Sequence, residues 1–274
     1  MFRIIIALLI FILPQAAYAE TAYDRVLKTE TLRCGYNYYE PGFIKDVETG
    51  QYRGIFYEFM EAFSQISGVK VEWTALVNWG DMRAAIEADK IDAFCISVWP
   101  NAQRAKFLAH SSPFFYVPVH AFARKGDERF QNGLSAVSER EDLKIAVLDN
   151  DVSDFLATQF FPKAKKVSAG FMSSDSKLFQ DVATKKADMT FTLAAAYLSY
   201  EKSNPNVLTQ VSNEPLRVFG NTIAVSNEEL KLLNFINVTI EEMHNSGMVA
   251  AIMKPYINEY EGSFLPVRLP YSVD

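Results

Sequence analysis

Two hydrophobic periods alternate over the first hundred residues of the chain. Short apolar runs rich in β-formers predict buried strands. Between these runs, apolar side chains recur every three or four positions, as in a helix that packs one face on a core. Gly68 follows the longer helical pattern, where glycine favours the end of a helix. The predicted strands are residues 31–36, 69–73 and 91–98, and the predicted helices are residues 55–66 and 82–88.

The second half of the chain partly repeats this pattern. Lys-x-Asp precedes an apolar strand at Lys90 and again at Lys186. A β-α-β-α-β order predicts parallel strands with right-handed crossovers, so we predict an α/β protein with two lobes, each a doubly wound, mostly parallel sheet. The later strands are predicted at residues 143–148, 165–168 and 189–193, and the later helices at residues 151–161, 178–184, 228–245 and 248–256.

Two segments are predicted to connect the lobes. Residues 117–120 leave the first lobe and residues 219–221 return to it, because the last two helices are expected to pack on the first lobe. The first lobe would then comprise residues 20–117 and 221–274, and the second lobe residues 118–220. Crossing twice makes the first lobe discontinuous in sequence.

The first 19 residues have the pattern of a signal peptide. Arg3 provides a charged start, residues 4–13 are apolar, and Ala17-Tyr18-Ala19 is an A-x-A cleavage site. Ten apolar residues are too few to span a bilayer. We therefore expect cleavage before Glu20 and export of the mature protein to the periplasm of a bacterium.

Charge and composition exclude several functions. Removal of Arg3 with the signal peptide changes the formal charge from −6 to −7, which argues against nucleic acid or an anionic membrane as a partner. The three histidines share no metal-ligand spacing with one another or with cysteine, so no metal site is predicted. We expect no cofactor. No Ser-His-Asp or Cys-His constellation and no phosphate-binding loop is visible, which predicts that the protein is not an enzyme.

Residues 90–116, KIDAFCISVWPNAQRAKFLAHSSPFFY, carry a resemblance to a known family. Asp92-Ala93, Arg104 and Pro113 followed by aromatic residues have the spacing found in family-3 extracellular solute-binding proteins of bacterial ABC importers, which include amino-acid-binding proteins. LRCGY, RGIFYEFMEAF, KIAVLDN and HNSGMVAAIMKPY extend the similarity over residues 30–257. The resemblance implies the two-lobed type II periplasmic-binding-protein fold, in which the two crossings form a two-segment hinge that lets the lobes close. It also implies a ligand in the cleft between the lobes and a membrane permease as partner. We expect a monomer.

Arg104 is the strongest candidate for a ligand-binding residue. Asn101 occupies the position of a helix N-cap, and Arg104 would lie in the first turn, where a positive charge is unfavourable for the helix dipole. A guanidinium matches a carboxylate in a bidentate geometry. The resemblance implies that Arg104 binds the carboxylate of the ligand. The alternative is a surface arginine paired with a neighbouring acid.

The end of the same predicted strand supplies further candidates. Relatives place small hydroxyl residues at the positions of Ser97 and Trp99, so Ser97 fits the pattern and Trp99 departs from it. Trp99 either stacks on a ligand or fills the core. Trp79 lies before a predicted helix, where relatives have an apolar or aromatic cleft residue. Ser97, Trp99 and Trp79 are therefore predicted to line the site.

The turn after the first strand is a second edge where ligands could bind. Asn37 and Tyr39 follow this strand, but relatives have an acid in place of Asn37 and an aromatic residue in place of Glu40. Asn37 and Tyr39 are predicted to contact the ligand. The alternative is that they only cover the hydrophobic core.

Two departures concern the ligand's ammonium group. Asp151 lies at a predicted helix N-terminus, where it either caps the helix or pairs with an ammonium. Relatives that bind α-amino acids carry an aspartate five residues after the position of Asp188, and Leu193 stands there in this chain. An unpaired buried ammonium is costly. We therefore predict that the common amino acids are poor ligands and that better ligands carry a single anionic group with an apolar part or a distal cation.

Cys34 and Cys95 lie on strands that should be neighbours in the first lobe. In an oxidising compartment they could form a disulfide, but sheet geometry is demanding for such a bond. Two buried thiols are the alternative, and the sequence leaves both open.

The function predicted from these features is capture of a small polar solute, amino-acid-like or carboxylate-bearing, and its delivery to a permease. One alternative is a periplasmic enzyme on the same fold, since a few relatives are dehydratases, with Glu40 or Asp151 as an acid or base. A third interpretation is a subunit that reports its ligand to a membrane receptor.

Overall fold

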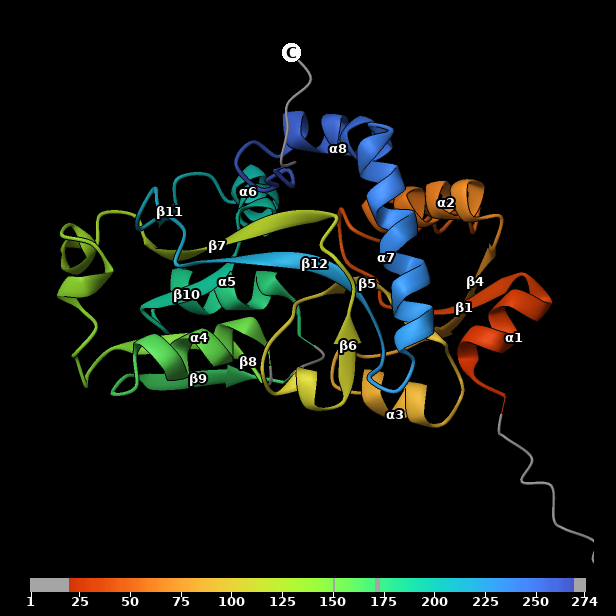
Figure 1. Ribbon diagram of the computed structural model, residues 1–274. Coiled ribbons are helices and arrows are strands. Elements are labelled where there is room, and N and C mark those ends of the chain that lie inside the picture. Colours follow the sequence, from red (N-terminus) through yellow and green to blue (C-terminus); the bar gives the residue numbers. More distant parts are fainter. Residues whose placement is uncertain (1–19, 150, 171–172, 269–274) are drawn as a thin grey trace, which may run out of the picture.

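The computed structural model describes residues 20–149, 151–170 and 173–268. Its main sheet has ten strands, and eight of them follow the order β4-β1-β5-β12-β7-β10-β8-β9 (Figure 1). Parallel pairs lie at the two ends of this order, and the antiparallel strands β7 and β12 lie between them. The predicted α/β fold class is confirmed. The predicted signal peptide lies outside the described residues.

The first lobe contains the parallel strands β1 (Thr31–Tyr36), β4 (Lys70–Leu76) and β5 (Ala93–Val98). All six residues of β5 are buried, as expected for a strand with elements on both faces. Helix α2 (Ile55–Ser67) buries an aromatic face and ends at Gly68, whose φ of 71° is in the left-handed region that glycine tolerates. The other helices of this lobe are α1 (Ala22–Thr29), α3 (Met82–Glu87), α7 (Leu230–Asn245) and α8 (Met248–Glu259).

The second lobe is built around β8 (Lys144–Leu148) and its parallel neighbours β9 (Lys165–Ala169) and β10 (Met189–Leu193). Its own core is centred on the buried rings of Phe122 and Phe179. The remaining elements are α4 (Val152–Phe160), α5 (Asp175–Ala183), α6 (Ala194–Ser203), β11 (Leu208–Gln210) and the 3₁₀ turns η2 (Glu128–Phe130) and η3 (Leu134–Ala136).

Two long strands connect the lobes. β7 (Phe115–Arg124) and β12 (Arg217–Ser226) run side by side across the middle of Figure 1, with pairs from Arg217↔Val119 to Asn221↔Phe115. β12 also pairs with β5, so it belongs to both lobes. Gly220 allows β12 to pass close to Pro113, because a Cβ added at Gly220 would lie 2.9 Å from the Pro113 side chain. The predicted connecting residues 117–120 and 219–221 lie inside these two strands.

The helix predicted to begin near Asn101 and to include Arg104 does not form as an α-helix. Only a single 3₁₀ turn, η1 (Arg104–Lys106), forms there, because strand β6 (Leu108–His110) begins almost at once and pairs with β12. Asn101 is not the N-cap of this turn, which is Gln103, but its Oδ1 accepts from the backbone N–H groups of Gln103 and Arg104 at 3.0 and 2.9 Å and so stabilises the chain that leads into it. The sequence patterns also did not predict α1, α6, β6 or the hairpin β2 (Ile44–Lys45) and β3 (Tyr52–Arg53).

A disulfide joins the neighbouring strands β1 and β5. Cys34 and Cys95 are both fully buried, and their Cα atoms lie 5.5 Å apart. Within the described part of the chain, no helix is both long and apolar enough to cross a membrane.

Candidate functional site

Ser97 and Trp99 meet at the end of β5 on one asparagine of β12. The Ser97 hydroxyl donates to Asn221 Oδ1 at 2.6 Å, and the Trp99 indole N–H donates to the same oxygen at 3.1 Å. Asn221 is only 1% exposed. Because β5 and β12 are hydrogen-bonded neighbours, the fold itself brings these residues together.

Arg104 is tied to this group through the backbone of Trp99. Its Nη1 donates to the Trp99 carbonyl oxygen at 3.1 Å. Burial lowers the pKa of the half-buried guanidinium, and the negative charge of Asp151 works in the opposite direction. Within the described residues, Arg104 forms no ion pair with a carboxylate. The guanidinium therefore has no direct counter-ion in the described part of the chain.

Tyr39 and Trp79 form the aromatic side of the group. Their ring centroids lie 5.9 Å apart, and Trp79 also contacts Phe94 of β5 with ring centroids 5.4 Å apart. Burial raises the pKa of the Tyr39 hydroxyl, and a hydrogen bond with Ser97 partly opposes this shift. We call Tyr39, Ser97, Trp99, Arg104 and Asn221 the site cluster, because hydrogen bonds connect them in series.

Two aspartates of the second lobe are electrostatically coupled to each other, and one of them, Asp151, also interacts with the charge of Arg104. Asp151 occupies the N-cap position of α4, but its side chain makes no capping hydrogen bond. Burial raises the pKa of its carboxyl, and both the Val152 N–H and the charge of Arg104 oppose the rise. Asp175 begins α5 and accepts a 3.0 Å hydrogen bond from the Thr192 hydroxyl. Burial, together with the charge of Asp151, raises the Asp175 pKa to about 6.

Two further positions singled out in the sequence make local contacts. The side-chain oxygen of Asn37 accepts from the Tyr38 backbone N–H at 2.8 Å, which stabilises its own turn. Leu193 is the N-cap of α6 and packs against the hydrophobic core, so its position is apolar as the sequence indicates.

Sequence reasoning missed Asn221, Asp175 and His110. Asn221 is a polar residue within the strand pattern of residues 217–226, which is a usable signal. Asp175 lies in SSDS, which resembles an ordinary helix start. His110 Nδ1 lies 3.2 Å from the Thr222 hydroxyl, while its Nε2 is buried without a partner among the described residues. Burial and the nearby Arg104 charge lower the pKa of His110 to about 4.

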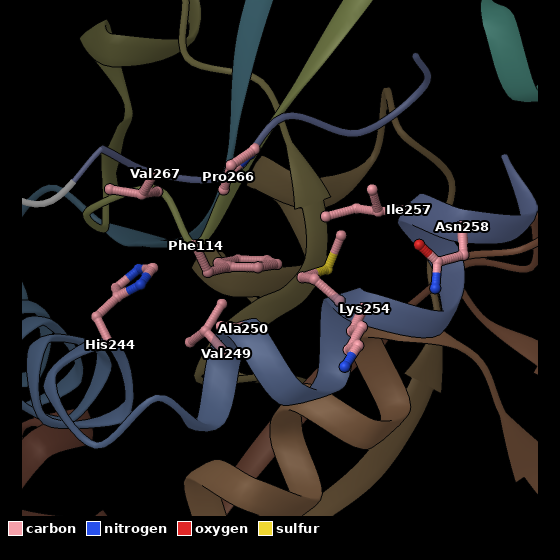
Figure 2. A pocket seen from close by; sticks show the side chains of 10 residues that line it. Phe114, His244, Val249, Ala250, Lys254, Ile257, Asn258, Pro266 and Val267 are labelled. Atoms are coloured by element: carbon pink, nitrogen blue, oxygen red, sulfur yellow. The ribbon is translucent and has the colours of Figure 1, made fainter. Parts of the chain in front are cut away.

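Two pockets lie elsewhere on the first lobe. Figure 2 shows an apolar pocket of about 300 Å³, with the ring of Phe114 between side chains of α8 and the segment of Pro266 and Val267. A polar pocket of about 520 Å³ is lined by Arg83, Lys106 and several acids. Neither pocket includes any of the predicted ligand-binding residues.

Comparison with known proteins identifies relatives that match most of the chain. A probable amino-acid ABC transporter-binding protein of Haemophilus influenzae is 22% identical over 84% of this chain and 85% of its own length. An ancestral amino-acid-binding protein, described as a precursor of cyclohexadienyl dehydratase, has a TM-score of 0.71 and 24% identity over 86% of this chain and 99% of that one. An ancestral arginine-binding protein bound to arginine has a TM-score of 0.65 and 26% identity, over 83% and 98%.

The family assignment rests on most of the chain. Residues 32–259, from β1 to the end of α8, match the sequence profile of the bacterial extracellular solute-binding proteins, family 3. The similar solved structures include two-lobed amino-acid-binding proteins, in agreement with the fold predicted from the sequence. This chain is therefore a member of the bacterial extracellular solute-binding proteins of family 3.

Proposed function

We propose that this chain is the periplasmic solute-binding subunit of an ABC importer. It captures an amino-acid-like solute with a carboxylate between its two lobes and delivers it to a membrane permease. The observation that carries this proposal is the half-buried Arg104 guanidinium, which has no ion-pair partner among the described residues. A charge removed from water without a counter-ion is unfavourable, and a ligand carboxylate relieves that cost.

The charges across the site define the class of ligand. Arg104 is positive on the first lobe, while Asp151 and Asp175 are acids on the second lobe. A simple dicarboxylate would bring its second anion toward these acids and is disfavoured. A solute with a carboxylate at one end and a cation at the other complements both lobes. L-arginine and L-lysine have this form, and Asp151, whose charge interacts with that of Arg104, would pair with their α-ammonium in place of the apolar Leu193. Arginine is the ligand bound in one of the similar structures, which supports this choice.

Ligand binding that touches both lobes also explains transport. A ligand held by Arg104 on one side and by the acids on the other favours the closed arrangement of the lobes, because only that arrangement makes both sets of contacts. The name of the Haemophilus influenzae relative supports delivery to an ABC permease. The partner of this chain would then recognise the closed, loaded form.

A second candidate function is a dehydratase-like enzyme. One similar structure is described as a precursor of cyclohexadienyl dehydratase. The Asp175 pKa of about 6 leaves part of this carboxyl protonated near neutral pH, as a general acid requires. Recovery of the bound solute unchanged after long incubation argues for transport, whereas a dehydrated product argues for catalysis.

The decisive experiment has two parts. Mass spectrometry of solute released from denatured protein identifies what the protein retains, and calorimetry then measures L-arginine, L-lysine, L-glutamine and L-glutamate. We expect micromolar affinity for a cationic amino acid, about −8 kcal/mol, and much weaker binding of L-glutamate. Tighter binding of L-glutamate than of L-arginine, or no retained solute and no binding of any of the four, contradicts the proposal.

A further inference from the structure

One face of the returning strand β12 lies against the site cluster. Alternate residues of a strand point to the same face, and Arg217, Phe219 and Asn221 are alternate residues. Phe219 stacks on the Trp99 ring with centroids 4.7 Å apart and an interplanar angle of 12°. The Arg217 guanidinium lies 5.0 Å from the centroid of the Phe219 ring. We call these three residues the β12 face.

The hydrogen bonds of Asn221 have a fixed direction. An indole N–H only donates, so the group that accepts from Trp99 must be the carboxamide oxygen of Asn221. The same oxygen accepts from Ser97, and the Asn221 side-chain nitrogen is buried with no partner among the described residues. An unsatisfied buried donor costs about 1–3 kcal/mol, so this asparagine is unfavourable for strand packing alone.

Trp99 is consequently held at two points by the same strand. Its N–H is bound by Asn221 and its ring face is covered by Phe219. The backbone carbonyl of Trp99 in turn accepts from Arg104. A shift of Trp99 would therefore also move the carbonyl oxygen to which the Arg104 guanidinium donates.

The β12 face also reaches the second lobe. The Arg217 guanidinium lies 5.2 Å from the centroid of the Phe155 ring, and it donates to the side chain of Gln159 at 2.9 Å. Phe155 and Gln159 belong to α4, the helix that begins next to Asp151. One strand face thus contacts both the site cluster and the helix that carries the opposing acid.

We propose that Asn221 is a positioning residue of the ligand site. Its carboxamide oxygen holds Ser97 and Trp99 at the end of β5 and, through Trp99, sets the place of the Arg104 guanidinium that receives the ligand's anion. The role in ligand binding rests on the proposed function, while the positioning itself is a property of the ligand-free protein.

The positioning is tested without ligand by NMR of the ¹⁵N-labelled tryptophan indoles in full-length mature protein. Asn221→Ala is compared with Asn237→Ala, a control on α7 whose Oδ1 accepts from the Ser112 backbone N–H at 2.7 Å. Trp99→Phe assigns the Trp99 signal. We expect Asn221→Ala to shift the Trp99 indole signal and to increase its hydrogen exchange at least tenfold. The Trp73 signal should not change, because Trp73 lies on β4, which β1 and β5 separate from β12 in the sheet.

The consequence for binding is tested with L-arginine in a calorimeter. We expect Asn221→Ala to weaken binding at least tenfold and Asn237→Ala to stay within twofold of wild type. In a Trp99→Phe background, which keeps an aromatic ring but removes the indole N–H, Asn221→Ala should cost less than in wild type. Thermal melting of each variant separates this effect from a general loss of folding.

The outcomes distinguish the two proposals. An unchanged Trp99 indole signal in Asn221→Ala overturns the positioning role, as does wild-type affinity for L-arginine in that variant. If wild-type protein does not bind L-arginine, the proposed ligand class fails. The indole signals still decide whether Asn221 positions Trp99.

Discussion

Each lobe has an aspartate with the same kinds of neighbours, buried in the first lobe and partly buried in the second. Asp92 precedes β5 and accepts from the Arg33 backbone N–H of the adjacent parallel strand at 2.7 Å; Asp188 precedes β10 and accepts from the Lys144 backbone N–H at 2.8 Å. Each carboxylate also pairs with two arginines, Arg25 and Arg33 for the first and Arg124 and Arg129 for the second. The repeated Lys-x-Asp pattern is thus explained by the scaffold.

The opposite ends of the same strands differ between the lobes. Five residues after Asp92 stands Ser97, which hydrogen-bonds to Asn221 of the site cluster, whereas five residues after Asp188 stands apolar Leu193. Arg104 makes the first lobe positive at this edge, while Asp151 and Asp175 make the second lobe acidic. The two lobes therefore share the aspartate that precedes the central strand, and they differ in the residues at the other end of that strand, where the lobes face each other.

The largest expected effect comes from removing the only arginine of the site cluster. Arg104→Ala should abolish measurable binding of L-arginine, a loss of about 3–5 kcal/mol, because the buried ligand carboxylate loses its charged partner. Calorimetry checks this, with Arg140→Ala as control, since Arg140 pairs with Asp142 on the exposed surface of the second lobe. Near-normal affinity of Arg104→Ala would show that the anion is bound elsewhere.

A stability difference between the lobes is expected from the disulfide, which cross-links only the first lobe among the described residues. The bond closes a loop with a sequence separation of 61, for which chain entropy predicts a contribution of up to about 4 kcal/mol. Replacing Cys34 and Cys95 by alanine should lower the free energy of unfolding by about 2–4 kcal/mol in urea. Unchanged stability of the double variant contradicts this expectation.

The two anchoring aspartates should not be equivalent. Asp92→Asn and Asp188→Asn each weaken hydrogen bonds to charged groups, which are worth about 1.5–3 kcal/mol. The side chain of Asp92 is 0% exposed and that of Asp188 is 14% exposed, so water replaces lost contacts less well at Asp92. Urea unfolding should show the larger loss for Asp92→Asn. Equal losses would mean that residual exposure does not distinguish the two anchors.

The smallest effect is a pH dependence that arises from the second lobe alone. The Asp175 pKa is raised above its ordinary 3.8 to about 6, so its stabilising contribution is present below about pH 4 and is lost as the pH rises through 6. The same ionisation provides the anion that a cationic ligand needs. Affinity for L-arginine should therefore rise about tenfold from pH 5 to pH 7.

Asp175→Asn isolates this contribution. The variant should show a flatter affinity profile between pH 5 and pH 7, and its ligand-free melting temperature should depend less on pH over the range 4–6. Asp142→Asn, at an exposed residue of the same lobe, should keep the wild-type profile. An unchanged slope in Asp175→Asn would assign the pH dependence to another group.

Local patterns in the sequence were sufficient for most of the scaffold. Residues 31–36 form the predicted strand, and the helix that ends before Gly68 is α2. These predictions succeed because the spacing of hydrophobic residues and the conformational freedom of glycine depend on only a few neighbouring residues. The same reasoning failed around Arg104, where pairing of β6 with β12 limits the helix to one turn.

The sequence by itself determined the fold class, the two repeated anchors and the candidacy of Arg104, Ser97 and Asp151. Only the tertiary structure decided that Ser97 and Trp99 share the oxygen of Asn221, which is 124 and 122 positions away along the chain. It also placed Asp175 close enough to Asp151 for the two charges to interact. Contacts of this kind depend on strand order and register in the sheet, which periodicity within a short segment does not contain.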